Sequence, residues 1–261
     1  MDALRIAATG MDAQQTRVAV ISNNIANMST TAFSTRRAEF VDLHYQQIRA
    51  PGAISSSTGL IAPGGIELGL GVRMSTISIN IEQGALRQTS SDLDLAVEGR
   101  GFFEVTLPSG ALAFTRDGSF KRTGEGLIVN SDGYPLGGDV TIPVDARSVT
   151  INANGEVFAF FDGQPNGQLI GAIPLTLFVN EKGLEALGGN LFRQTEASGA
   201  PIPGEAGIDG RGAIRQGFLE DSSVDVVQQI ADLIEAQRGY ELNSKVISAA
   251  DQMLGAATQI R

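Results

Sequence analysis

Glycine and proline are confined to the middle of this 261-residue chain, and this uneven distribution limits what each part can fold into. Only Gly10 precedes residue 51, and only Gly239 and Gly255 follow residue 221. The other 29 of the 32 glycines and all 9 prolines lie between. Each glycine inside a helix costs about 1 kcal/mol and each proline about 3 kcal/mol. The two ends are therefore free to form long helices, whereas the middle is not.

Apolar residues recur every seven positions at both ends, which is the pattern of a coiled-coil seam. The N-terminal pattern predicts a helix over residues 2–27. The C-terminal pattern predicts a helix over residues 224–260, with Ser222 and Asp225 as a capping box at its start. The seam residues are Leu4, Met11, Val18 and Ile25 with Ala7, Ile21 and Met28 beside them, and Val226, Leu233, Tyr240, Ile247 and Leu254 with Ala236, Ala250 and Ala257 beside them.

Two interpretations of these stripes remain open. Each helix can lie on a domain of its own as an ordinary amphipathic helix. Two heptad helices at opposite ends of one chain instead favour pairing of the ends as a coiled coil. A pair of that kind leaves apolar surface exposed, so it needs further copies of the chain to bury it.

The middle of the chain has the pattern of β-structure. Short runs rich in Val, Ile, Phe and Thr alternate with Asp-Gly and Asn-Gly pairs, as in residues 114–120, 127–134 and 149–157. These dipeptides supply the positive φ that tight hairpins require. Several hairpins in succession predict a β-sandwich or a barrel-like domain. Residues 45–71, rich in Gly, Pro and Ser, have the composition of a linker without a core.

The predicted fold class is therefore α+β. We expect long N- and C-terminal helices pairing as a coiled coil, an extended linker arm, and an all-β middle domain that is sandwich- or barrel-like. The predicted boundaries are 1–44 for the N-terminal helix and the start of the arm, 45–87 for the arm, 88–221 for the β-rich domain and 222–261 for the C-terminal helix.

Composition argues against several classes of function. The chain has no Cys and a single histidine, His44, so thiolate metal sites, His clusters and disulfides are excluded. A net charge of −10 disfavours nucleic-acid binding. No apolar run approaches the roughly 18 residues that a membrane span needs, and the first residues lack a Sec signal pattern. We expect no cofactor, no metal and no direct membrane insertion.

The search for catalytic motifs is mostly negative. Gly69-Leu70-Gly71 and Gly210-Arg211-Gly212 each lack the third glycine of a dinucleotide loop. Asp92 and Asp94 start like a calcium loop, or like the paired carboxylates of a glycosidase, but their spacing is also that of a half-buried strand. The strand interpretation is favoured, so no catalytic residue is predicted.

Sequence motifs at both ends resemble those of the flagellar rod and hook axial proteins. The segment 22–27, Ser-Asn-Asn-Ile-Ala-Asn, followed by Thr30, Thr31, Phe33 and the Arg36-Arg37 pair, resembles their N-terminal signature. The segment 235–245 is similar to their C-terminal motif, except that Gly239 stands where the family commonly has Ala. Segments 98–103 and 115–120 are similar to the family's middle region, so the resemblance covers nearly the whole chain.

This resemblance implies a structural subunit, not an enzyme, in a hollow helical assembly with the terminal helices inside and the β-domain outside. It implies a drive shaft of the basal body that crosses the periplasm and transmits torque to hook and filament, with subunits exported through the flagellar type III apparatus. The stretch 45–53 resembles the segment that distinguishes distal rod members from hook protein, with a proximal rod or hook-type subunit as the alternative. The implied partners are further copies of the chain, proximal rod proteins, hook protein and surrounding ring proteins.

The residues expected to pack between subunits follow from the heptads and the N-terminal motif. The three asparagines of that motif can instead cap the helix locally, and this alternative stays open. The predicted packing residues are Leu4, Met11, Val18, Ile21, Ile25, Asn23, Asn24, Asn27, Val226, Leu233, Tyr240, Ile247 and Leu254.

Two other classes of function compete with the structural subunit. One is a periplasmic enzyme such as a glycan hydrolase, for which the chain has no spare length. The other is a monomeric binding module for cell-wall or ring components. Removal of the termini discriminates, because an enzyme or binding module keeps its activity in the isolated middle, whereas a polymer subunit loses assembly.

Overall fold

The computed structural model describes residues 2–50, 64–138, 140–163 and 166–259. The chain forms two compact units. The helical unit comprises Met1–Ala26, Arg36–Ser78 and Asp225–Arg261, and the β unit comprises Asn27–Thr35 and Ile79–Val224. The chain therefore passes between the units four times, after residues 26, 35, 78 and 224.

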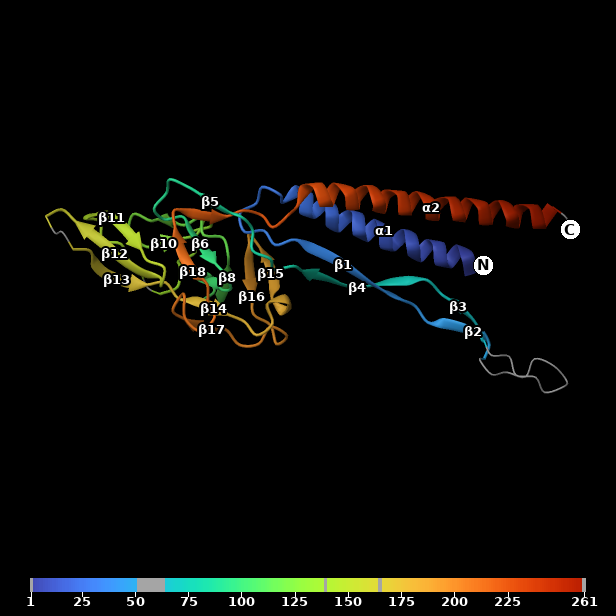
Figure 1. Ribbon diagram of the computed structural model, residues 1–261, viewed down its shortest axis with the longest axis horizontal. Coiled ribbons are helices and arrows are strands. Elements are labelled where there is room, and N and C mark those ends of the chain that lie inside the picture. The colour runs from blue at the N-terminus through green and yellow to red at the C-terminus, as the bar shows by residue number, and fades with distance from the viewer. Residues whose placement is uncertain (1, 51–63, 139, 164–165, 260–261) are drawn as a thin grey trace. The chain divides into compact units, whose positions relative to one another are not determined.

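Two long helices, α1 (Asp2–Ala26) and α2 (Val226–Gln259), lie side by side and run in opposite directions in the helical unit (Figure 1). A Cβ added at Gly10 of α1 would lie 2.9 Å from Nδ2 of Asn243, and one added at Gly239 of α2 would lie 3.1 Å from Cδ of Gln14. The helices thus approach each other where one of them carries a glycine and the other an amide side chain. At its start, α2 is capped by Asp225, whose Oδ1 accepts hydrogen bonds from the amides of Val227 (2.9 Å) and Gln228 (3.2 Å).

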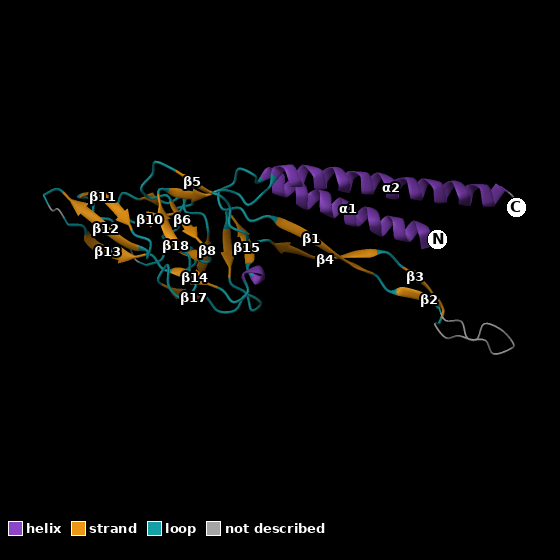
Figure 2. Cartoon of the chain, viewed as in Figure 1, coloured by secondary structure: helices purple, strands orange, loops and turns teal. Residues whose placement is uncertain are grey.

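A ribbon of paired strands completes the helical unit (Figure 2). β1 (Arg36–Asp42) pairs with β4 (Val72–Ile79), and β2 (Tyr45–Arg49) pairs antiparallel with β3 (Ile66–Gly69). The ribbon contacts α1 at the start of β4, where the amide of Val72 donates to Oγ1 of Thr9 at 3.3 Å. Every side chain of β2 is exposed, including Ile48 at 64%.

The β unit holds short strands arranged in several sheets. The largest has the order β15-β16-β8-β7-β14-β17, a second has the order β11-β12-β13, and three two-stranded sheets pair β18 with β6, β19 with β5 and β10 with β9. The strands are β5 (Leu86–Gln88), β6 (Leu95–Glu98), β7 (Phe102–Thr106), β8 (Leu112–Thr115), β9 (Lys121–Arg122), β10 (Ile128–Val129), β11 (Ala146–Ile151), β12 (Glu156–Phe161), β13 (Gln168–Ala172), β14 (Leu175–Leu177), β15 (Glu185–Gly188), β16 (Leu191–Arg193), β17 (Ile202–Gly204), β18 (Ala213–Gln216) and β19 (Phe218–Glu220), with a 3-10 turn at Glu181–Gly183.

Two clusters of apolar side chains form the core of the β unit. The larger includes Phe103, Val105, Ile142 and Val157, all nearly inaccessible to solvent. The smaller is mostly aromatic: Phe178 packs edge-on against both Phe102 and Phe114, with ring centroids 6.0 and 4.8 Å away. The two faces of β7 thus contribute to different clusters, because successive side chains of a strand point to opposite sides.

The Asn-Gly and Asp-Gly pairs behave differently from one another. Asn154-Gly155 lies in the turn between β11 and β12, with Gly155 at φ 87° and Oδ1 of Asn152 accepting from the amides of Asn154 and Glu156. Asp117-Gly118, in contrast, closes no hairpin between named strands. Its role is close approach, because a Cβ at Gly118 would collide with the carbonyl oxygen of Leu95.

The predicted fold class needs correction. The arm predicted at 45–87 is not an extended linker, because its described residues form β2, β3 and β4 of the ribbon and also β5, which pairs with β19 in the β unit. The middle is not a two-sheet sandwich or a barrel, since its described strands divide among one six-stranded, one three-stranded and three two-stranded sheets. The observed fold has one long helix near each end of the chain and a mostly β middle.

Each of the two errors has a physical reason. Most Gly, Pro and Ser of the predicted arm lie in residues 51–65, between β2 and β3, whereas the strands themselves carry residues such as Tyr45, Ile48 and Val72, and their backbone groups pair with each other without a core. Frequent glycines also end strands after a few residues, which favours many small sheets over two large ones. Among the described residues, no helix is long and apolar enough to cross a membrane.

We predict that Gly118→Ala destabilises the β unit by roughly 2–3 kcal/mol, because the added methyl group collides with backbone and not with a movable side chain. The matched control is Gly124→Ala, where nothing lies within 4 Å of the added atom and φ is not positive. We expect the control to stay within about 0.5 kcal/mol of the parent chain. Urea unfolding followed by circular dichroism measures both, and equal stability of the two variants would contradict the assignment.

Candidate functional site

The predicted packing residues lie on the two helices, with one exception. Ile21 and Asn24 are buried, and Asn23 and Tyr240 are exposed. Asn27 belongs to the β unit, and the side chain of Leu254 lies outside the described residues. The remaining residues are half-buried: Leu4, Met11, Val18, Ile25, Val226, Leu233 and Ile247.

α1 contacts α2 through the heptad position that directly precedes the predicted seam position. Gly10, Arg17 and Asn24 of α1 are seven residues apart, and each contacts α2, so the large predicted residues Met11, Val18 and Ile25 follow them by one position. The buried residues of the helices are mostly small, including Ala7, Ala13, Ala236 and Ala250. Val20 and Ile21 are the large apolar residues of α1 that are buried with them, whereas Leu4, Met11, Val18 and Ile25 stay half-buried.

Apolar surface therefore remains open on the helical unit. Val18 and Tyr240 line a groove of about 390 Å³ together with Gln15, Gln237 and Glu241. Six further large apolar residues of α2 are exposed: Val227, Ile230, Ile234, Leu242, Val246 and Met253. A soluble monomer rarely leaves this much apolar side chain in water along one helix, which marks the helix as an interaction surface.

Asn24 joins three elements within the helical unit. Its side chain is buried at 1% exposure, and its Nδ2 donates to the carbonyl of Arg36 (2.8 Å) and to Oε1 of Gln229 (2.9 Å). Its Oδ1 accepts from the amide of Arg36 at 3.0 Å. One buried amide thus fastens the start of β1 and the first turns of α2 to α1. This contact within the chain is specific, and it satisfies all the groups that the Asn side chain presents here.

Three segments of the β unit lead directly into the passages between the units. We call residues 27–35, 79–85 and 220–224 the connecting segments. They hydrogen-bond to one another: the amide of Ser223 donates to Phe33 O (3.0 Å), the amide of Thr35 to Ser223 Oγ (3.0 Å) and the amide of Asn80 to Thr35 O (2.8 Å). The four passages of the chain are therefore gathered at one place in the β unit.

Glu220 begins the third connecting segment and bonds to the other two and to the core. Its carbonyl oxygen accepts from the amide of Ala32 at 2.8 Å, and its Oε1 accepts from the amide of Gly84 at 3.0 Å. Its Oε2 accepts from Nε of Arg116 at 3.0 Å, and the two side chains are only 4% and 5% exposed. A carboxylate so deeply buried requires a paired cation and hydrogen bonds, and both are present.

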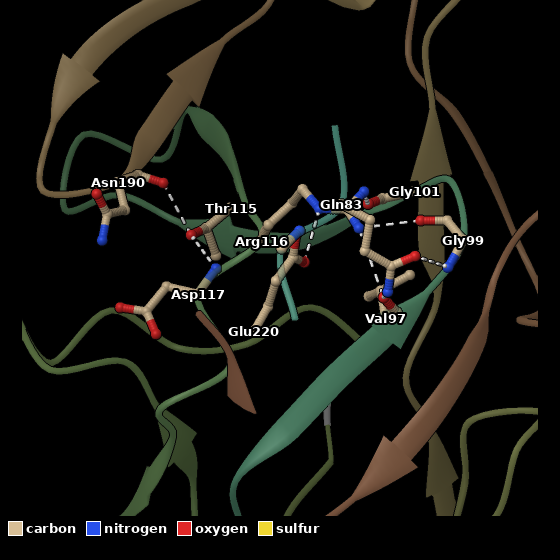
Figure 3. Close-up of polar contacts among 10 residues, drawn as sticks. Gln83, Val97, Gly99, Gly101, Thr115, Arg116, Asp117, Asn190 and Glu220 are labelled. Carbon is tan, nitrogen blue, oxygen red and sulfur yellow. Dashed lines mark hydrogen bonds and ion pairs between the residues drawn. The ribbon is translucent and has the colours of Figure 1, made fainter. Parts of the chain in front are cut away.

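Arg116 spreads its remaining donors over the turn between β6 and β7 (Figure 3). Nη1 donates to the carbonyl of Gly101 (3.2 Å), and Nη2 donates to the carbonyl of Gly99 (2.9 Å). Gln83, next to Gly84, holds the same turn, because its Oε1 accepts from the amide of Gly99 and its Nε2 donates to the carbonyl of Val97, both at 3.0 Å. The result is a continuous polar network inside an otherwise apolar region.

The first connecting segment is held in an unusual conformation. Ala32 is buried and has a φ of 54°, a left-handed value that non-glycine residues adopt only at an energetic cost. Asn190, itself at φ 59°, donates from its Nδ2 to the carbonyl of Thr31 at 2.9 Å, and its own carbonyl accepts from Oγ1 of Thr115. Backbone strain is thus concentrated where the chain enters the network around Glu220.

Sequence reasoning did not single out Arg116, Glu220, Gln83 or Asn190. The available signal was a charged residue directly after an apolar run, as in Phe218-Leu219-Glu220. That signal is weak, because charges commonly end strands. The described residues contain no group of three or more His, Asp or Glu that could hold a metal ion.

Comparison with known protein families gives three matches along the chain. Residues 4–33 match the family described as flagella basal body rod protein. Residues 96–159 match the D1 domain of the flagellar hook proteins FlgE/F/G, and residues 215–260 match the C-terminal family of the flagellar basal body rod proteins FlgEFG.

Relatives match over the full length of the chain. A flagellar basal-body rod protein FlgG of Caulobacter vibrioides is 51% identical over 261 residues, covering 100% of both chains. The FlgG proteins of Agrobacterium fabrum and Bacillus subtilis are 45% and 37% identical and cover 97% and 94% of both chains. A solved hook-protein structure from Helicobacter pylori covers 71% of this chain and 43% of that chain at 19% identity, with a TM-score of 0.25, too low for a comparison of folds. The chain belongs to the flagellar basal-body rod protein family.

Proposed function

We propose that this chain is the structural subunit of the distal rod, which self-assembles into a hollow helical drive shaft and transmits motor torque to hook and filament. The observation that carries the proposal is the full-length identity to flagellar basal-body rod proteins, together with a helix pair whose large apolar side chains are left unburied. A hook-type or proximal rod subunit is the second candidate, which the match of residues 96–159 to a hook, rod and related D1 family supports.

We propose that the exposed apolar residues of α1 and α2 pack against the helices of neighbouring subunits. The two helices meet mainly through small and amide side chains and the ion pairs of Arg17, so exposed large residues such as Ile230 and Val246 stay available for other copies. Isolated helix pairs of this kind are marginal in water, and repetition in a polymer supplies the missing burial. Asn24 acts within the subunit, whereas the roles of Asn23 and Asn27 between subunits stay a prediction.

The partners beyond the chain itself are proposed from the family. They are proximal rod proteins at one end of the assembly, hook protein at the other, and the surrounding rings. We place the assembly in the basal body across the periplasm, with export through the flagellar type III apparatus. We assign no catalytic role, since Asp92 lies in a turn, Asp94 forms a bridge to Ser119 just before β6, and the network around Glu220 is buried.

We propose that the arm at 45–63 wedges between adjacent subunits and resists their sliding. Its described part, β2, is exposed on all its residues, and a two-stranded ribbon of this kind has no core to hold it in water. Residues 51–63 lie outside the described residues. The wedge therefore rests on the exposed strand pair and on the resemblance to rod proteins.

The predicted boundaries lead to a test on the monomer. Limited proteolysis of verified monomer should remove the terminal helices first and leave a core near residues 88–220, because the helices lack their neighbours. Fragments are identified by mass spectrometry. Persistence of residues 1–30 in the resistant fragment would argue against an assembly-dependent helical unit.

The packing proposal predicts that Ile247→Asp blocks assembly and leaves the β unit folded. A carboxylate at a buried interface position should raise the critical concentration for polymerisation by roughly a hundredfold. Sedimentation of polymer and the circular dichroism signal of the β unit measure the two effects. Ser248→Asp, one residue further along and exposed, adds the same charge as a matched control, and assembly equal to that of Ile247→Asp would contradict the packing face.

The wedge proposal predicts that deletion of residues 46–63 leaves a polymer that bends more readily. The helices and the β unit lie outside the deletion, so polymer still forms. Electron micrographs of isolated basal bodies show whether the rods are straight. Straight rods in the deletion strain would place the stiffness elsewhere, in contacts of the β unit.

A further inference from the structure

Glu220 stands where every passage of the chain between the two units converges. It ends β19, and its carbonyl and side chain reach the segments at Ala32 and Gly84. The segments are also bonded to one another through Ser223, Thr35 and Asn80. Any force that the helical unit exerts on the β unit along the chain enters through these segments, because they contain the covalent connections.

The chemistry at this point is suited to fixing position and not to raising stability. A buried ion pair contributes little net stability, and apolar residues of similar volume often replace one without loss. A carboxylate instead fixes the positions of its hydrogen-bond donors. Oε2 of Glu220 accepts from Nε of Arg116, and Oε1 accepts from the amide of Gly84. The guanidinium adds a planar fork that holds the carbonyl groups of Gly99 and Gly101 at fixed angles.

The network also reaches the centre of the largest sheet. Arg116 directly follows β8, and the turn that it holds leads into β7, the neighbour of β8 in that sheet. The ion pair joins residues 104 positions apart in the sequence. The ion pair thus links the third connecting segment to two central strands, β7 and β8.

We infer that the Glu220–Arg116 pair, with Gln83 and Gly84, is a clamp that transfers force from the helical unit to the β unit. The clamp holds the connecting segments in register with the sheet, and the strained Ala32 is tied to it through the hydrogen bond from its amide to the carbonyl of Glu220. The statement that the force is torque rests on the proposed function as a rod subunit. The coupling of the connecting segments to the ion pair does not rest on that function. An experiment can therefore contradict the torque transfer without contradicting the coupling.

The coupling is tested by hydrogen–deuterium exchange on the full-length monomer. In the double variant Arg116→Met/Glu220→Leu, apolar groups of similar size replace both charges, so no buried charge is left unpaired. The carbonyls of Gly99 and Gly101 and the amide of Gly84 lose these partners, so the urea midpoint should fall while the β unit stays folded. The amides of the connecting segments should exchange about tenfold faster, a larger increase than for the amides of β7 and β12. Glu220→Gln keeps an acceptor for Gly84 but leaves the Arg116 guanidinium buried without a counter-charge, so it should give an increase at least as large. It replaces the double variant if that variant does not fold.

The matched control removes an exposed ion pair of the same kind. Arg215→Met/Glu98→Leu breaks the contact between Arg215 Nε and Glu98 Oε2 (2.6 Å), which joins β18 to β6 but touches no connecting segment. Unchanged exchange in the connecting segments of the clamp variant, or an equal increase in the control, overturns the inference.

The transfer of torque is tested in cells that carry the clamp variant. Rods should assemble, because the helical surface is unchanged, and swimming speed should fall more steeply with the viscosity of the medium than in the parent and control strains. Parental speeds at all viscosities, or absence of rods, overturn the torque transfer. If exchange in the monomer is faster but swimming speed equals that of the parent strain, the clamp orders the connecting segments and does not transmit torque.

Discussion

A carboxylate buried to 4% exposure needs partners, and the partners of Glu220 organise the β unit around the places where the chain enters and leaves it. Arg116 supplies the opposite charge from the centre of the large sheet, and the amides of Ala32 and Gly84 supply hydrogen bonds from the connecting segments. Each hydrogen bond in the network requires its donor and acceptor to be aligned. The connecting segments are consequently held to one arrangement, which an apolar core of similar volume would not impose.

The helical unit is held together by close approach of two helices and not by a buried polar network. Its two helices meet through glycines, alanines and amide side chains, which permit close approach but bury little apolar area. Gly10 and Gly239 lower the intrinsic stability of the helices, but the absence of a Cβ leaves space for Asn243 and Gln14 of the opposite helix. Val20 and Ile21 are buried within the subunit, but most large apolar residues of α2 are not, so the driving force for their burial remains available for contacts with other copies.

The ribbon of β1 to β4 has features of both units. The backbone groups of β2 and β3 satisfy each other, yet side chains such as Tyr45 and Ile48 face water. A ribbon of two strands is marginal in isolation, so its order depends on what lies against it. In a rod subunit this makes the ribbon sensitive to neighbours, in contrast to the β unit, which has a complete core of its own.

The sequence by itself determined where helices could form, because the exclusion of Gly and Pro from the ends and the seven-residue spacing are local properties. It also determined family membership, through motifs at both ends. Only the tertiary structure decided which helix faces meet, since Met11 and Gly10 are adjacent in sequence and their choice depends on the shape of the opposite helix. The same holds for the division of the middle into several small sheets, and for the pairing of Arg116 with Glu220 across 104 residues. Such contacts are set by long-range packing and by the cost of leaving a buried charge alone, and no local pattern encodes either.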